Sequence, residues 1–267
     1  MTTHPSAKSG HLQTENEAMT GLILAEQQEG ICTLTLNNPR KKNALSLALL
    51  VELEQGLERL QSDSDLRAVI LQGAEGTFSV GADLSDVTGT VADQEIDERI
   101  QRVNQLMRAL PVPCLAAIEG PCVGGAVTVA LACDALVASE RAFFQIPATR
   151  LGLLYSPDAV AQFHARLGSR ALMRLLLLGE RWDAQTALHT GLVGWVVPES
   201  TTREKVLELV RNMAKAPKAV GATKSLLLAL EQGEQNLSYW KEIYVNILSS
   251  PERQAAVAQA KERLSIA

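Results

Sequence analysis

The chain has 267 residues, 46% of them hydrophobic, which is enough to bury the core of one large domain. Its formal net charge is −5, so it presents no overall basic field that would attract nucleic acid or an anionic membrane. Its apolar runs are too short to cross a bilayer. We therefore expect a protein with neither nucleic-acid nor membrane partners.

The N-terminal segment and the cysteines indicate a compartment. Residues 1–20 are polar and carry no apolar stretch after a basic start, so we expect a disordered tail rather than a signal peptide. The four cysteines lie in apolar contexts and form no C-x-x-C pair, which predicts buried, reduced thiols. We therefore expect a cytoplasmic protein.

Strands and helices alternate along the first part of the chain. The pattern predicts a β-hairpin over residues 21–27 and 30–36, then an amphipathic helix over 46–61 with Ser46 as its N-cap. Further elements are expected as a strand at 68–73, a helix at 96–110, a strand at 114–118, an all-apolar helix at 125–133, and strands at 134–138 and 142–145. Residues 85–95 are polar and irregular, as in a mobile flap. This alternation favours an α/β fold.

From Ser156 onward the pattern is mostly helical. Ser156, Pro157 and Asp158 make a strong helix start, because an N-cap, a proline and an acid follow one another. One late strand is expected over 192–197, and helices over 169–178, 183–190, 202–215, 217–231, 236–248 and 251–263. We predict a core over 21–200. A C-terminal helical region over 201–267 would serve oligomer packing and pocket closure.

Two glycine-rich turns are the most informative part of the chain. They are Gly76-Thr-Phe-Ser-Val-Gly-Ala-Asp-Leu84 and Ile118-Glu-Gly-Pro-Cys-Val-Gly-Gly-Ala126, and each follows an apolar, strand-like run. Glycine permits a positive φ and close approach, which leaves backbone N–H groups free to meet a developing negative charge. Two such turns aimed at one point would form an oxyanion hole, and this predicts chemistry on a carbonyl group.

Five segments in order resemble the enoyl-CoA hydratase/isomerase (crotonase) superfamily. They are Leu36-Asn-Asn-Pro-Arg-Lys-Lys-Asn-Ala-Leu45, the turn over 76–84, Gly120-Pro-Cys-Val-Gly-Gly-Ala126 with Cys133-Asp134, Phe144-Gln-Ile-Pro-Ala-Thr-Arg-Leu-Gly152, and Ala184-Gln-Thr-Ala-Leu-His-Thr-Gly-Leu-Val193. The resemblance spans residues 21–260. It implies a crotonase-type spiral of ββα units with a C-terminal helical region, usually assembled as a homotrimer or a dimer of trimers.

The resemblance also implies an acyl-CoA substrate and its site residues. By position, the oxyanion donors would be the backbone N–H groups of Ala82 and Gly125. The basic cluster Arg40, Lys41 and Lys42 lies in a loop that passes near the CoA phosphates in relatives, although a solvated surface run is the alternative. The residues expected to bind CoA are Arg40, Lys41, Lys42, Ala44, Ala82, Asp83 and Leu84, with Lys224 a lesser candidate for the 3′-phosphate. CoA would arrive as part of the thioester, so we expect no separate cofactor and no metal.

The sequence departs from the hydratase pattern at two positions. Hydratases that it resembles carry one catalytic glutamate three residues after the oxyanion glycine and another directly after the proline of the fourth segment. These positions hold Thr128 and Ala148 here. A threonine hydroxyl is too weak an acid or base to replace a glutamate, so hydration by paired carboxylates is not expected.

Asp158 is the remaining candidate for moving a proton. It lies in a stretch that lines the acyl pocket in relatives, although it would equally complement the dipole of its helix. Tyr155 is either a hydrogen-bond donor in the same pocket or a packing residue. Two functions follow: an acyl-CoA isomerase or lyase that stabilises a thioester enolate, or an acyl-CoA-binding protein that has lost the chemistry. Other reactions of the superfamily use the same hole and remain open.

Overall fold

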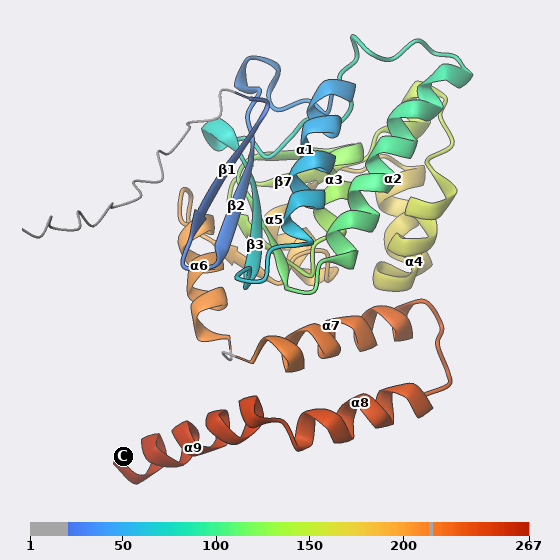
Figure 1. The fold of residues 1–267 in the computed structure, drawn as a ribbon. Coiled ribbons are helices and arrows are strands. Elements are labelled where there is room, and N and C mark those ends of the chain that lie inside the picture. Colours follow the sequence, from blue (N-terminus) through green and yellow to red (C-terminus); the bar gives the residue numbers. More distant parts are fainter. Residues whose placement is uncertain (1–20, 214–215, 267) are drawn as a thin grey trace, which may run out of the picture.

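The structure, a computed structural model, describes residues 21–213 and 216–266. The predicted tail over 1–20 lies outside the described residues. Figure 1 shows a body of strands and helices, with the last helices extending beneath it. Within the described residues, no helix is both long and apolar enough to span a membrane.

The larger sheet forms the centre of the body. Its strands lie in the order β1 (Ile23–Gln28), β2 (Ile31–Leu36), β3 (Ala68–Gly73), β4 (Cys114–Ile118), β6 (Ala135–Ser139) and β9 (Trp195–Val197). β1 is antiparallel to β2, and the other neighbours pair in parallel. A smaller sheet joins β5 (Pro121–Val123), β7 (Phe143–Gln145) and β8 (Trp182–Asp183) in that order. The predicted mixture of strands and helices is confirmed.

Local signals explain the first elements. The hairpin of β1 and β2 turns at Glu29 and Gly30, whose φ values of 53° and 77° are those of a two-residue hairpin turn. Helix α1 (Leu47–Leu60) begins after Ser46, whose hydroxyl accepts a hydrogen bond from the Leu49 amide at 3.2 Å. The predicted hairpin, helix and N-cap are therefore confirmed.

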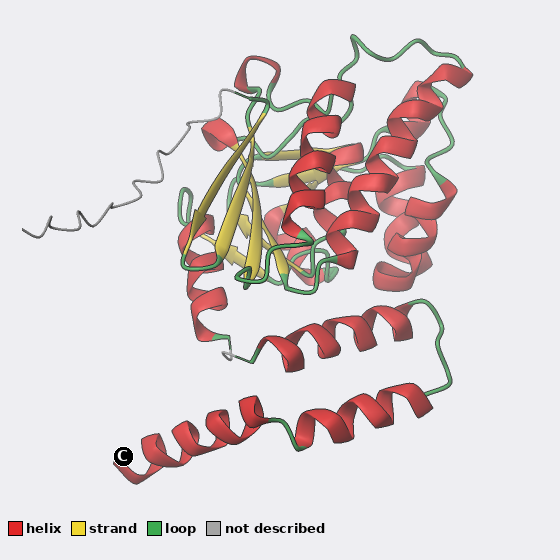
Figure 2. Cartoon of the chain, viewed as in Figure 1, coloured by secondary structure: helices red, strands yellow, loops and turns green. Residues whose placement is uncertain are grey.

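Three further helices follow α1. They are α2 (Gln94–Ala109), α3 (Gly125–Leu131) and α4 (Pro157–Leu172), and α2 packs against both α1 and α3. Figure 2 shows α1, α2 and α4 to one side of the larger sheet. Residues 126–131 of α3 are all buried, as a sequence that is apolar except for Thr128 predicts.

The helix expected over 169–178 takes a different form. α4 runs on to Leu172 with a break at Gly168, whose φ is 72°, and a π-helical segment, Met173–Leu177, follows. The short helix α5 (Ala184–His189) then precedes β9.

The C-terminal helices divide into two groups. α6 (Thr202–Asn212) packs on the larger sheet, where its Val206 and Val210 join a core with Ile70, Leu115 and Val137. α7 (Pro217–Glu231), α8 (Ser238–Leu248) and α9 (Pro251–Ile266) form the extension seen in Figure 1. The predicted boundary between the core and the C-terminal helical region, at residue 200, stays a prediction. Within residues 201–267, α6 packs on the larger sheet.

Candidate active site

The two glycine-rich turns lie side by side. The Phe78 amide donates to the Glu119 carbonyl at 2.7 Å, and the Ser79 amide donates to the Pro121 carbonyl at 3.0 Å. The Val123 amide returns a hydrogen bond to the Ser79 carbonyl at 3.0 Å, which completes a parallel bridge between Ser79 and Cys122. The first turn therefore runs along β5 as a short added strand, and this pairing fixes the two turns in register.

Glycines allow the turns to approach closely. Gly81 has a φ of 88°, and a Cβ at this position would lie 2.5 Å from the Val123 carbonyl oxygen and 3.4 Å from the Gly125 nitrogen. Gly124 also has a positive φ, 57°, directly before α3 begins. A side chain at Gly81 would force the turns apart, so glycine is what brings Ala82 near Gly125.

Among the described residues, the backbone N–H groups of Ala82 and Gly125 have no hydrogen-bond acceptor. Leu45 forms backbone hydrogen bonds with the residues on either side of Ala82. Its N–H donates to the Gly81 carbonyl at 2.8 Å, and its carbonyl accepts from the Asp83 N–H at 3.2 Å. Gly125 is the first residue of α3, where an N–H has no partner within the helix. In the part of the chain that the structure describes, neither of these two N–H groups donates a hydrogen bond. Both are available to an oxygen atom.

The basic loop docks beside the first turn. The Lys41 ammonium lies 2.6 Å from the Asp83 carboxylate and also donates to the Ser85 hydroxyl at 3.0 Å. The hydrogen bond from Lys41 is the largest cause that lowers the pKa of Asp83 to about 2. Arg40 and Lys42 are exposed next to this pair. The structure thus holds this loop against the first turn through Lys41 and Lys42, and the binding of CoA by these residues stays a prediction.

Thr128 lies one turn beyond Gly125 on α3 and contacts Tyr155. Its buried hydroxyl is 2.5 Å from the Tyr155 hydroxyl. Tyr155 stacks on Phe163 of α4, with 6.1 Å between ring centroids. Burial raises the pKa of the Tyr155 phenol far above its ordinary value of 10.0, so the phenol is neutral at pH 7. The hydroxyl groups of Thr128 and Tyr155 are thus hydrogen-bonded to each other.

A family model described as enoyl-CoA hydratase/isomerase matches residues 26–264. The chain belongs to this family. It is 29% identical over 246 residues to 2,3-dehydroadipyl-CoA hydratase of Escherichia coli, which covers 90% of this chain and 95% of the relative. It is 32% identical over 209 residues to enoyl-CoA hydratase domain-containing protein 3, mitochondrial, of Rattus norvegicus, covering 77% of this chain and 69% of that protein.

Solved structures of the family share the fold. An enoyl-CoA hydratase/carnithine racemase from Magnetospirillum magneticum superposes with a TM-score of 0.86 at 26% identity and covers 91% of this chain and 93% of its own. An enoyl-CoA hydratase from Bacillus anthracis gives a TM-score of 0.83 at 30% identity, with 90% and 96% covered. The predicted crotonase-type α/β fold is confirmed.

Neither family glutamate position holds a carboxylate in this member. Thr128 is tied to Tyr155, and Ala148 is buried at the start of a short 3₁₀ turn, Ala148–Leu151. Asp158 is exposed on the first turn of α4, where it lines a groove with Gln101 and Gln105 of α2. Its catalytic role stays a prediction. Ser156, the expected N-cap, makes no capping hydrogen bond and instead accepts one from the Gln101 amide at 2.9 Å.

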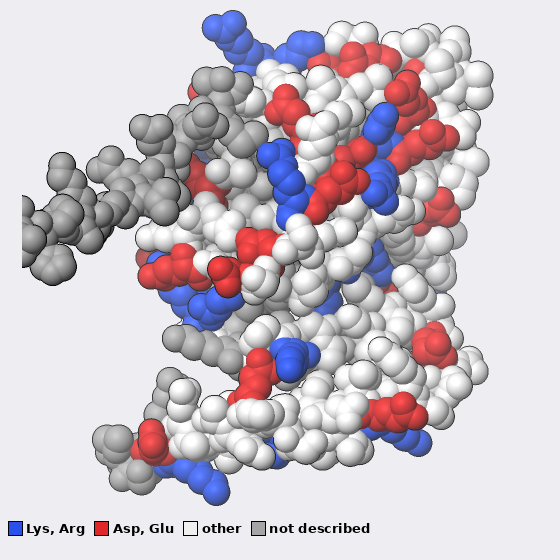
Figure 3. Space-filling view, in the orientation of Figure 1, with Lys and Arg blue, Asp and Glu red and all other residues white. Residues whose placement is uncertain are grey.

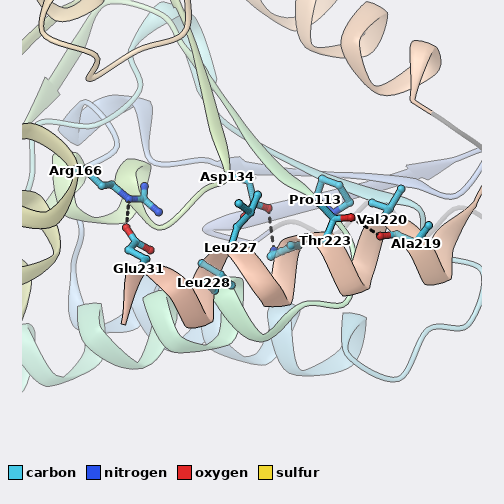
Figure 4. Close-up of a pocket in the computed structure, with 10 residues that line it drawn as sticks. Pro113, Asp134, Arg166, Ala219, Val220, Thr223, Leu227, Leu228 and Glu231 are labelled. Carbon is cyan, nitrogen blue, oxygen red and sulfur yellow. Dashed lines mark hydrogen bonds and ion pairs between the residues drawn. The ribbon is translucent and has the colours of Figure 1, made fainter. Parts of the chain in front are cut away.

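Lys224 is committed to a structural contact. Its buried ammonium lies 2.9 Å from the Asp134 carboxylate and donates to the Met107 and Val112 carbonyls at 3.2 and 3.0 Å. Figure 4 shows Asp134 and the Arg166–Glu231 pair in this groove between α7 and the body. The prediction that Lys224 meets the 3′-phosphate of CoA is therefore not supported, because the ammonium is satisfied within the protein.

Reasoning from the sequence missed Asp97, a half-buried carboxylate on α2. Among the described residues its carboxylate accepts no hydrogen bond and forms no ion pair. The sequence did hold one signal that Asp97 is close to the core. Asp97 precedes Ile100 by three residues, so it flanks the apolar face of α2.

Proposed function

We propose that the protein binds an acyl-CoA thioester and stabilises its enolate through the backbone amides of Ala82 and Gly125. The observation that carries this proposal is a pair of N–H groups on adjoining turns that donate no hydrogen bond within the described part of the chain. Such donors are fixed before the reaction and meet charge as it develops on the carbonyl oxygen. Each contributes roughly 3 kcal/mol to the transition state.

The reaction proposed is migration of a double bond rather than hydration. In the hydratases that the chain resembles, hydration uses two paired carboxylates, and the two family positions hold Thr128 and Ala148 here. Double-bond migration requires one group that takes a proton from one carbon atom and returns it to another. Coenzyme A enters as part of the substrate, so we propose no separate cofactor.

The exposed cations beside the first turn support the placement of the CoA phosphates. Arg40 and Lys42 flank Lys41, which is held by Asp83 next to Ala82. A thioester whose carbonyl meets Ala82 would carry its phosphates toward this loop, where cations suit them.

Assembly as a homotrimer or a dimer of trimers remains part of the proposal. α8 has no buried residue, and its Tyr239, Tyr244 and Val245 are exposed. A helix that exposes large apolar side chains is suited to cover by another copy of the chain. The free, buried thiols fit the proposed cytoplasmic location.

Incubation with 3-enoyl-CoA and 2-enoyl-CoA, followed by chromatography of the products, tests the reaction. Interconversion of the two esters is expected. Formation of 3-hydroxyacyl-CoA as the main product would contradict isomerisation, and calorimetric binding without any turnover would support the second candidate, an acyl-CoA-binding protein. That candidate rests on the missing carboxylates at positions 128 and 148.

A further inference from the structure

The proposed isomerisation requires a group that moves a proton, and this inference rests on that proposed function. Thr128 and Tyr155 offer only hydroxyl groups beside the oxyanion turns. The carboxylate of Asp97 lies on α2, which packs against α3, the helix that begins with Gly125.

The position of Asp97 on α2 is fixed by two neighbours on the same side of the helix. Residues three and four positions apart share a helix face, so Asp97 adjoins Ile100 and Gln101. The Ile100 Cδ1 atom lies 2.7 Å from the point where a Cβ of residue 125 would stand. Gln101 donates to Ser156, the residue after Tyr155. This face of α2 therefore lies between the oxyanion glycine and the tyrosine.

The two arginines near Asp97 on α2 form ion pairs on another side of the helix. Arg99 pairs with Glu54 at 3.1 Å and Arg102 pairs with Glu58 at 2.8 Å, both across to α1. Figure 3 shows basic and acidic side chains interspersed on this face of the molecule. Among the described residues no cation forms an ion pair with Asp97, so its carboxylate is left without a counter-charge.

The surroundings of Asp97 suit a base. Burial, and then the charge of Asp93, raise the pKa of the Asp97 carboxyl. Asp97 in turn contributes to the raised pKa of Tyr155, which places the two groups within electrostatic reach. Cys122 also contributes to the raised pKa of Tyr155, and burial raises the pKa of the Cys122 thiol well above 9.0. Tyr155 and Cys122 are therefore both neutral at pH 7, and on the α4 side Asp158 stands beside Gln101.

We propose that Asp97 is the catalytic base of this site, in which the Tyr155 hydroxyl is a neutral hydrogen-bonding group. The carboxylate takes a proton from C2 of a 3-enoyl-CoA, and the electron pair of that C–H bond forms a dienolate whose oxygen is held by Ala82 and Gly125. The resulting carboxylic acid returns the proton to C4. The double bond then lies between C2 and C3, and no other reactant is consumed.

The test compares the wild type with Asp97→Asn, Asp97→Glu, Asp158→Asn and Glu95→Gln. Glu95 is exposed on the same turn of α2, so its variant controls for the loss of one negative charge. Three quantities are measured: isomerisation of 3-enoyl-CoA, deuterium uptake from D₂O at C2 of a saturated acyl-CoA, and the calorimetric Kd of that saturated ester. Circular dichroism verifies the fold of each variant.

We expect Asp97→Asn to slow isomerisation and deuterium uptake by about 100-fold or more while the Kd changes little. Asp97→Glu retains part of the activity because it keeps a carboxylate, and the control Glu95→Gln behaves as the wild type. The wild-type kcat/KM falls as the pH drops through the raised pKa of Asp97. The residual kcat/KM of Asp97→Asn does not show this fall at low pH.

The outcomes separate the two proposals. If the wild type isomerises the ester and Asp97→Asn does so within about threefold of it, Asp97 is not the base and the proposed function stands. Loss of activity in Asp158→Asn with retention in Asp97→Asn would transfer the role to Asp158. A wild type that binds the ester but neither isomerises it nor exchanges deuterium would overturn both proposals.

Discussion

The Tyr155 hydroxyl lies 2.5 Å from the Thr128 hydroxyl, at the position where hydratases that the chain resembles carry a catalytic glutamate. The contact joins the segment before α4 to α3, one turn from the oxyanion glycine. This position therefore holds a hydrogen-bonded pair of neutral groups and no carboxylate.

The first prediction concerns that pair. Tyr155→Phe leaves the buried Thr128 hydroxyl without its partner and should lower the free energy of unfolding by about 1–2 kcal/mol. Thr128→Val together with Tyr155→Phe should cost less than the sum of the single variants, with a coupling energy of about 1 kcal/mol. Urea unfolding of the four proteins measures this coupling. Strict additivity would show that the two hydroxyl groups do not interact.

The second prediction concerns the close approach of the turns. Gly81→Ala places a Cβ 2.5 Å from the Val123 carbonyl oxygen, in addition to the strain of a positive φ. Gly89→Ala is the matched control, because Gly89 also has a positive φ, 73°, but has open space around it. Both variants carry a backbone cost of about 1–2 kcal/mol.

Only Gly81→Ala should lose more stability than this backbone cost, and only Gly81→Ala should also lose acyl-CoA turnover. Urea unfolding and the isomerisation assay measure these effects. Equal behaviour of the two variants would mean that the turns can separate without consequence.

The third prediction concerns the Lys41–Asp83 ion pair. The folded-state pKa of Asp83 is lowered to about 2 from 3.8, so the pair contributes stability above pH 4 that is lost as the pH falls toward 2. Lys41→Gln should cost roughly 1 kcal/mol at pH 7, a value discounted because Lys41 is half-exposed.

The difference between wild type and Lys41→Gln should shrink when unfolding is measured at pH 3. Lys42→Gln serves as the control, since Lys42 is exposed on the same loop. A difference that stays constant with pH would show that the pair does not stabilise the ionised Asp83.

The fourth prediction separates the proposed base from a structural residue. The pKa of Asp97 is raised in the folded state, so ionisation of this group destabilises the fold as the pH rises above the ordinary value of 3.8. Asp97→Asn should therefore be more stable than the wild type at pH 7, and its advantage should vanish at low pH. A marked loss of stability at pH 7 would indicate that Asp97 holds the fold together instead.

The elements set by neighbouring residues were predictable from the sequence. The turn at Gly30 and the cap at Ser46 act within a few residues, so the hairpin and α1 could be placed directly. β5 could not, because its three residues become a strand only by pairing with β7 and with the segment at Ser79. Its existence depends on partners that are distant in the sequence.

The same distinction applies to the candidate site. The glycines of both turns could be located, because positive φ and close approach require them locally. The surroundings of Asp97 and Lys224 could not, because segments far along the chain create them: Ser156 contacts Gln101 next to Asp97, and Asp134 contacts Lys224.

The central claim is that two backbone amides hold the thioester oxygen. Infrared difference spectroscopy of [1-¹³C]butanoyl-CoA, free and bound, tests it most directly, because a saturated ester reports the contact without any turnover. If the N–H groups of Ala82 and Gly125 hold that oxygen, the carbonyl band moves to lower wavenumber in the complex. A carbonyl band at the same position in the free and fully bound ester would contradict the claim.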